Sequence, residues 1–146
     1  MTPEQQQKVL NNIESEVKWY ATYGESAEIK QLLLCQDRMT ILGFTLAEIV
    51  SSAKLAYSAT ATRKKAKQIE KEFEYKQDGI KPTEAKNKAF LDVRVFEETE
   101  NTEKAYFALV DLKRQQLNRV IEAIKQRISY AKQEKERTER MPTENA

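Results

Sequence analysis

The protein has 146 residues, of which 40% are apolar and 33% charged, and its net charge is +2. Only three glycines and three prolines are present, too few for the turns of a β-sandwich or a doubly wound α/β fold. The chain is instead rich in Ala, Glu, Lys, Gln and Leu, which favour helices. These features predict an all-α fold made of a few long helices.

The residue types present exclude several chemistries. There is no histidine, and Cys35 is the only cysteine, so imidazole bases, an intrachain disulfide and Cys/His metal clusters are excluded. No carboxylate lies in clearly apolar sequence surroundings and no glycine-rich phosphate loop is present. We therefore expect no enzyme activity, no metal site and no cofactor.

The first predicted helix covers residues 3–23. Thr2 is a suitable cap, Pro3 suits the first helical position, and Gln5 can complete a capping box. Apolar side chains then recur at three- and four-residue steps, at Val9, Leu10, Ile13, Val17 and Tyr20. Gly24 predicts the end of this helix.

The second predicted helix covers residues 27–76, and Ser26 is its expected cap. A helical apolar period runs from Ile29 to Tyr57 and becomes weaker beyond it. At 1.5 Å per residue, such a helix is about 75 Å long. The Asp-Gly and Pro-Thr pairs within residues 77–83 then predict a loop.

The third predicted helix covers residues 84–136, with Thr83 as its expected cap. Its apolar stripe begins at Ala85, is interrupted by a polar stretch over 97–104, and resumes as far as Ala131. Residues 137–146 have no apolar face, so we expect a disordered tail there. Residues 1–136 are expected to form a single all-helical domain.

The two long helices are joined by a short loop, which predicts a long antiparallel, coiled-coil-like hairpin covered at its open end by the shorter N-terminal helix. Ile121, Ile124 and Ile128 lie on one stripe and are the expected core or oligomer face. No third helix covers residues 62–96, although aromatic residues occur there. We therefore expect either an exposed binding tip or burial by other subunits in a homo-oligomer.

A basic segment lies on the second helix and contains Arg63, Lys64, Lys65, Lys67 and Lys71. One interpretation is a phosphate-binding stripe for single-stranded nucleic acid, with Tyr57 and Tyr75 as stacking platforms. The alternative is a solvated helix face. In that case the lysines pair across the hairpin with Asp92, Glu97 and Glu98, and the sequence leaves both interpretations open.

Residues 120–132, VIEAIKQRISYAK, resemble the closing helix of phage recombination mediators of the UvsY type. The layout is also similar: a small, histidine-free helical chain with a basic segment before a glycine-containing turn. The resemblance implies a ring-shaped homo-oligomer that binds single-stranded DNA and helps to load a recombinase onto strands coated with single-strand-binding protein. It places the DNA contacts in the basic segment, where Glu70, Glu72 and Glu74 depart from the family pattern.

Three functions are therefore compatible with the sequence. The first is a DNA recombination or replication accessory protein, with the recombinase and the single-strand-binding protein as further partners. The second is a structural or adaptor protein, such as a virion or assembly component, that binds only proteins. The third is an inhibitor of a host nucleic-acid enzyme. Purely apolar runs such as 32–35 are far shorter than the ~20 residues of a membrane span, so we expect a cytoplasmic protein without a membrane partner.

Overall fold

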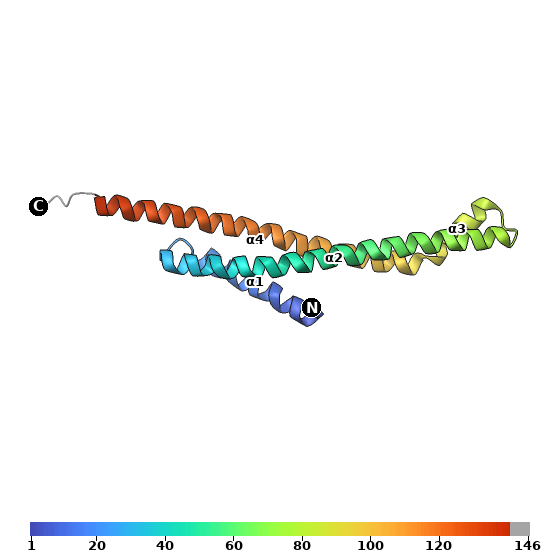
Figure 1. Cartoon of the computed structure of the whole chain (residues 1–146), viewed down its shortest axis with the longest axis horizontal. Helices are drawn as coiled ribbons and strands as arrows, with labels where there is room; N and C mark the ends of the chain where they lie inside the picture. The colour runs from blue at the N-terminus through green and yellow to red at the C-terminus, as the bar shows by residue number, and fades with distance from the viewer. Residues whose placement is uncertain (141–146) are drawn as a thin grey trace, which may run out of the picture. The chain divides into compact units, whose positions relative to one another are not determined.

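A computed structural model describes residues 1–140 and confirms the all-α fold class. The helices are α1 (Pro3–Tyr23), α2 (Ile29–Gln77), α3 (Pro82–Asp92) and α4 (Arg94–Arg140) (Figure 1). Within the described residues there is no strand. The two long helices α2 and α4 pack against each other as a hairpin, as the sequence predicts.

The start of α1 follows the predicted capping chemistry. The Thr2 hydroxyl accepts a hydrogen bond from the Gln5 backbone N–H at 3.1 Å, and the Gln5 side chain accepts one from the Thr2 backbone N–H at 2.8 Å. Gly24 follows the last residue of α1 but has right-handed backbone angles, with φ −56°. There is no room for a side chain at Gly24, because a Cβ there would lie 2.6 Å from the Tyr20 ring.

The beginning of α2 differs from the prediction by two residues. Ser26 does not cap α2, since its hydroxyl donates to the Tyr23 carbonyl oxygen at the end of α1. The Glu28 backbone N–H instead donates to the Gln31 side chain at 3.0 Å. The far end of α2, Gln77, lies one residue beyond the predicted limit.

The predicted third helix is two helices in the structure. Thr83 does not cap it, because Pro82 occupies the first position and Lys81 precedes it as the cap. The helix then breaks at Val93, whose φ of −97° and ψ of 10° are not helical. Ala85, Ala89 and Val93 are buried at four-residue steps, whereas the buried apolar side chains Val110, Leu117 and Ile124 of α4 follow one another at seven-residue steps.

The C-terminal end of α4 lies beyond the predicted limit. Residues 137–140, which were expected to be disordered, belong to this helix. From 132 to 140 every side chain is exposed, so the last turns of α4 add nothing to the core. The rest of the predicted tail, 141–146, lies outside the described residues.

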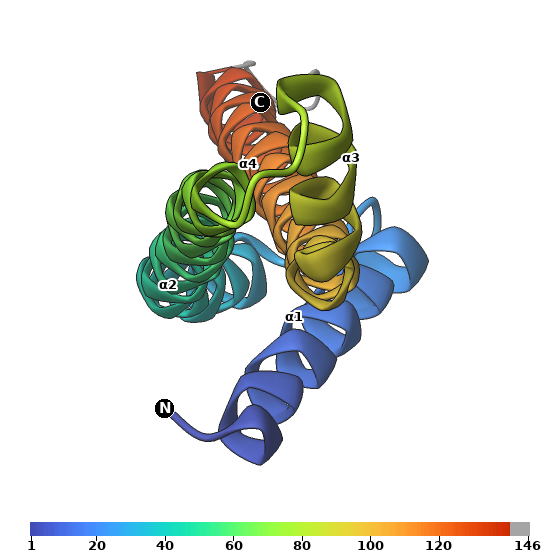
Figure 2. The same cartoon turned by 90° about the vertical axis from the view of Figure 1, so that its right-hand side faces the viewer.

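The chain divides into two compact units, each with its own core. Unit 1 contains residues 1–48 and the chain from 112 onwards. In unit 1, α1 lies beside the first part of α2 and the second part of α4 (Figures 1 and 2). Arg38 Nε binds Glu16 Oε1 at 2.7 Å, and Lys113 Nζ binds Glu14 Oε1 at 2.9 Å. Its buried apolar side chains are Leu10, Ile13, Leu32, Cys35, Met39, Leu46, Leu117, Ile124 and Ile128.

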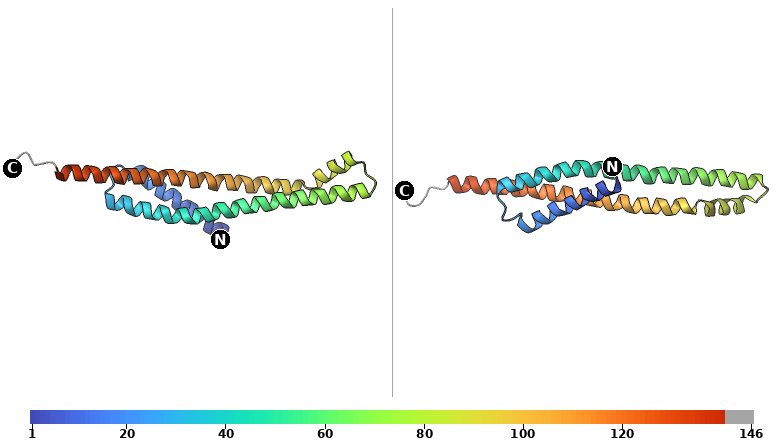
Figure 3. Two further views of the ribbon diagram at one scale, coloured as in Figure 1. Left: turned by 45° about the horizontal axis from the view of Figure 1, so that its top comes forward. Right: turned by 90° about the horizontal axis from the view of Figure 1, so that it is seen from below.

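Unit 2 contains residues 49–111, with α2 running antiparallel to α3 and the start of α4 (Figure 3). The turn between them uses Gly79 at a φ of 85°, a conformation that other residues rarely adopt. The Tyr57 and Phe107 rings pack with centroids 5.3 Å apart. The buried apolar side chains are fewer and smaller than in unit 1: Ile49, Ala53, Ala85, Ala89, Val93 and Val110.

Alanine substitutions at two glycines are expected to change stability in opposite directions. Gly79→Ala puts a side chain at positive φ and should destabilise the fold by about 1–2 kcal/mol. Gly43→Ala lies inside α2, where the new Cβ meets only Leu117 Cδ2 at 3.6 Å, and should stabilise by about 0.5–1 kcal/mol. Urea unfolding followed by circular dichroism measures both, and equal shifts would contradict this interpretation of Gly79.

Candidate nucleic-acid interface

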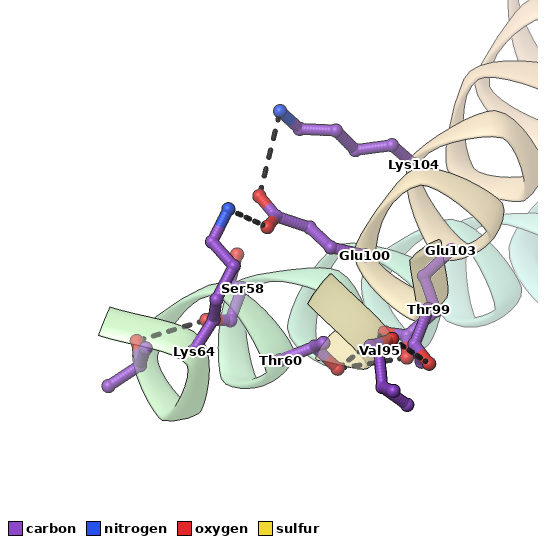
Figure 4. A network of polar contacts seen from close by, with 9 residues as sticks. Ser58, Thr60, Lys64, Val95, Thr99, Glu100, Glu103 and Lys104 are labelled. Carbon is purple, nitrogen blue, oxygen red and sulfur yellow. Dashed lines mark hydrogen bonds and ion pairs between the residues drawn. The ribbon is translucent and has the colours of Figure 1, made fainter. Parts of the chain in front are cut away.

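Lys64, in the middle of the predicted basic segment, points inwards rather than into solvent. Its Nζ lies 2.7 Å from Glu100 Oε2 on α4, and the side chains of Lys64 and Glu100 are only 27% and 10% exposed. Lys104 approaches the other oxygen of the same carboxylate at 3.8 Å (Figure 4). Lys64 therefore neutralises a buried carboxylate and is not available for phosphate binding.

The electrostatics of Glu100 agree with this geometry. The ion pair with Lys64 lowers the pKa of the Glu100 carboxyl below its ordinary value, against the opposing effect of burial, and Lys104 lowers it further. Glu100 is consequently ionised at neutral pH. A buried charge is costly unless a partner compensates it, so Lys64 is needed where it lies.

A second polar contact lies one turn away. The Thr60 hydroxyl is within 2.9 and 3.1 Å of the two oxygens of Glu103 (Figure 4), and Thr60 is only 7% exposed. Thr60, Lys64, Glu100 and Glu103 together form what we call the polar layer of unit 2. The charge pattern of the sequence does not predict this layer, although Thr60 follows the buried Ala53 by seven residues and Glu100 follows the buried Val93 by seven.

Lys67 and Lys71 pair with glutamates on their own helix. Lys67 Nζ lies 3.6 Å from Glu70, and Lys71 Nζ lies 3.3 Å from Glu74. The hydrogen bond with Glu74 raises the pKa of Lys71. These glutamates are two of those that depart from the family pattern. Both pairs are largely exposed, so solvent and salt screen them strongly.

Arg63 and Lys65 remain exposed, and within residues 1–140 no carboxylate forms an ion pair with either side chain. They flank Lys64 in the sequence, and successive helical residues are rotated by about 100°. The two cations therefore lie on opposite flanks of α2. The five predicted cations do not form one continuous outward stripe.

The predicted partners across the hairpin were wrong in register. Lys64 pairs with Glu100, not with Asp92, Glu97 or Glu98. Asp92 instead accepts a hydrogen bond from the Tyr75 hydroxyl, which raises the pKa of Tyr75. The pairs Tyr75–Asp92, Lys64–Glu100 and Tyr57–Phe107 are centred near residues 82–84 and not on Gly79, which explains the shift in register.

The two tyrosines are poor stacking platforms as they stand. The Tyr57 ring is packed against Phe107, and Tyr75 is half-buried with its hydroxyl bound to Asp92. Unit 2 as a whole carries twelve Lys or Arg and eleven Asp or Glu residues. The electrostatic potential at the surface of unit 2 therefore depends on where its individual cations lie, and not on an overall positive charge.

The other predicted residues lie in unit 1. Ile124 and Ile128 are buried and Ile121 is half-buried. Cys35 is buried, and burial together with the Glu16 carboxylate raises the pKa of its thiol to about 11. A protonated thiol is a poor nucleophile. Among residues 1–140 no group of His, Cys, Asp or Glu side chains could hold a metal ion.

One helix of the described chain, α2, is long and apolar enough to cross a membrane by length and composition, with a mean hydropathy of 1.3 over its most apolar 18 residues. The core helix of a soluble protein passes the same test. In unit 1 this helix supplies the buried side chains Leu32, Cys35 and Met39, and 28% of its most apolar window is buried.

Comparisons with known proteins add no relative: no family model, no curated protein and no solved structure matches this chain.

Proposed function

We propose that the protein is a non-enzymatic DNA recombination or replication accessory protein that binds single-stranded DNA through the exposed cations of α2. The observation that carries the proposal is that Arg63 and Lys65 are exposed and have no carboxylate partner within residues 1–140. Phosphate groups can supply the missing negative charge. Assistance in recombinase loading is the role implied by the resemblance of residues 120–132.

Lys67 is the third contact in this proposal. Its pair with Glu70 is 3.6 Å long and both side chains are about half exposed, so the pair is weak and a phosphate can compete for the lysine. Lys64 leaves the proposed contact set, since the buried Glu100 holds it. Lys71 donates a hydrogen bond to Glu74 at 3.3 Å, which makes it less available than Lys67. Contacts of this kind bind the backbone and do not distinguish base sequence.

Removing Arg63 and Lys65 is expected to reduce the salt dependence of DNA binding. Each phosphate contact contributes about −0.7 to the slope of log K against log salt for single strands. The variant Arg63→Ala/Lys65→Ala should therefore lose about 1.4 units of slope per subunit. Titrating labelled oligo-dT at several salt concentrations measures the slope, and alanine should preserve the helix.

A matched control removes the same charge elsewhere in unit 2. Lys54→Ala/Lys86→Ala changes two exposed lysines outside the basic segment and should leave the slope unchanged. If the two double variants lose the same slope, the DNA contacts are not specific to Arg63 and Lys65. If the unchanged protein does not bind oligo-dT, the proposed DNA function is wrong.

A structural or adaptor role is the second candidate function. It is favoured by large apolar side chains that unit 2 exposes, among them Ile69, Phe73 and Phe90 at 60%, 61% and 50%. Exposed apolar groups of this size are typical of protein-binding surfaces. The same titration separates the two candidates, because an adaptor that binds only proteins gives no salt-dependent signal with oligo-dT.

A further inference from the structure

Unit 1 contains a groove between α1 and α4 with an apolar floor and a basic rim. Its volume is about 600 Å³, and Ile13, Val17, Leu117 and Val120 form the floor. The rim carries the cations Lys18, Lys113 and Arg119 and the single carboxylate Glu14. Lys113 is bound to Glu14 at 2.9 Å, which leaves the exposed Lys18 and Arg119 as the cations that face solvent.

An exposed face of α2 in the same unit is also apolar but carries acidic side chains, and its end at Leu34 and Asp37 borders a hollow beside Lys132 and Lys135 of α4. Leu34, Ile41 and Phe44 are 50%, 66% and 71% exposed, and their spacing of seven and three residues places them on one helix face. Asp37 and Glu48 lie on this face too, exposed and without an ion-pair partner among residues 1–140. We call these five residues the acidic apolar face.

We infer that the acidic apolar face of one copy of this chain docks into the α1–α4 groove of a second copy. An apolar helix face with two carboxylates that form no ion pair among residues 1–140 complements an apolar floor whose rim carries the exposed cations Lys18 and Arg119. Docking removes Ile41 and Phe44 from water, which favours association. It also brings Asp37 and Glu48, which form no ion pair among residues 1–140, towards Lys18 and Arg119.

The face and the groove are different surfaces, so the contact is heterologous. Each copy that offers its face to one neighbour still has a free groove for another, and such contacts generate closed rings or open filaments. The inference does not depend on DNA binding, since it concerns unit 1 and its test contains no DNA.

The docking can be tested by mixing two variants, each of which should be unable to associate with itself. Phe44→Asp removes the largest exposed side chain of the face, and Lys18→Glu/Arg119→Glu reverses the rim of the groove. Multi-angle light scattering should give a mass of at least twice the 17.0 kDa of one chain for the unchanged protein and the monomer mass for each variant alone. An equimolar mixture should form a dimer, because one variant supplies an intact groove and the other an intact face.

Phe73→Asp is the control, since Phe73 in unit 2 is also largely exposed, at 61% against 71% for Phe44, and its loss should leave the mass unchanged. Circular dichroism checks that each variant keeps the helical content of the unchanged protein. A monomeric unchanged protein, a mixture that stays monomeric, or an equal loss of mass in Phe73→Asp would each overturn the inference. Retained assembly of the groove variant alone would also overturn it, because association would then be face to face.

Discussion

Replacing Ile124 by Asp is expected to unfold unit 1. Ile124 is fully buried in its core, and truncating such a side chain typically costs about 2–5 kcal/mol. The carboxylate adds the cost of burying a polar group without a partner, about 2–7 kcal/mol for a neutral one. Together these costs approach the whole stability of an ordinary domain, about 5–15 kcal/mol. Thermal unfolding followed by circular dichroism should show a large loss of cooperative helix.

The neighbouring Gln126 provides the control for charge. Gln126→Asp adds the same carboxylate two residues away on α4, where the side chain is exposed. Its melting temperature should stay close to that of the unchanged protein. If Ile124→Asp melts as Gln126→Asp does, the stripe that contains Leu117, Ile124 and Ile128 is not the core of unit 1.

The helices themselves could largely be predicted from the sequence because local chemistry determines them. The capping box of Thr2 and Gln5 and the regular apolar steps gave both ends of α1. The apolar period of α2 and the glycine turn at Gly79 gave the ends of α2 to within two residues. These signals act over three or four residues and need no knowledge of the fold.

Competition between neighbouring signals was harder to predict. Pro82 and Thr83 are both good helix-start residues, and the proline takes the first helical position, so Thr83 becomes part of the helix instead of its cap. The break at Val93 has no glycine or proline to announce it. The buried four-residue series Ala85, Ala89 and Val93 ends at this break.

The sequence predicted which cations lie in the basic segment, but not which side of α2 each of them faces. Charge counting groups Lys64 with Arg63 and Lys65, whereas the seven-residue step from Tyr57 places Lys64 on the inner side of α2. The same step from Val93 places Glu100 opposite it. The register between α2 and α4 depends on the conformation of the turn and of α3. The pattern of charges does not determine that conformation.

The polar layer makes unit 2 sensitive to loss of Lys64. Lys64→Met keeps much of the side-chain volume but leaves the buried Glu100 carboxylate with only Lys104, at 3.8 Å. Burial then becomes the main influence on Glu100, and it favours the protonated form. We expect Lys64→Met to lower the melting temperature at neutral pH. Lys67→Met, which breaks an exposed pair, should have little effect.

The pH profile of this loss identifies its cause. In the unchanged protein the pKa of Glu100 is lowered, so its stabilising effect is present above the unfolded-state pKa of about 4.3 and disappears as the pH falls through the folded-state value. In Lys64→Met the folded-state pKa of Glu100 should lie above its unfolded-state pKa. Protonation of Glu100 in acid then removes the cost of the buried, uncompensated charge. The difference in melting temperature between the two proteins should therefore be largest near neutral pH and shrink towards pH 4. Glu100→Leu in the Lys64→Met background should abolish that trend, and parallel profiles would show that the ion pair does not stabilise unit 2.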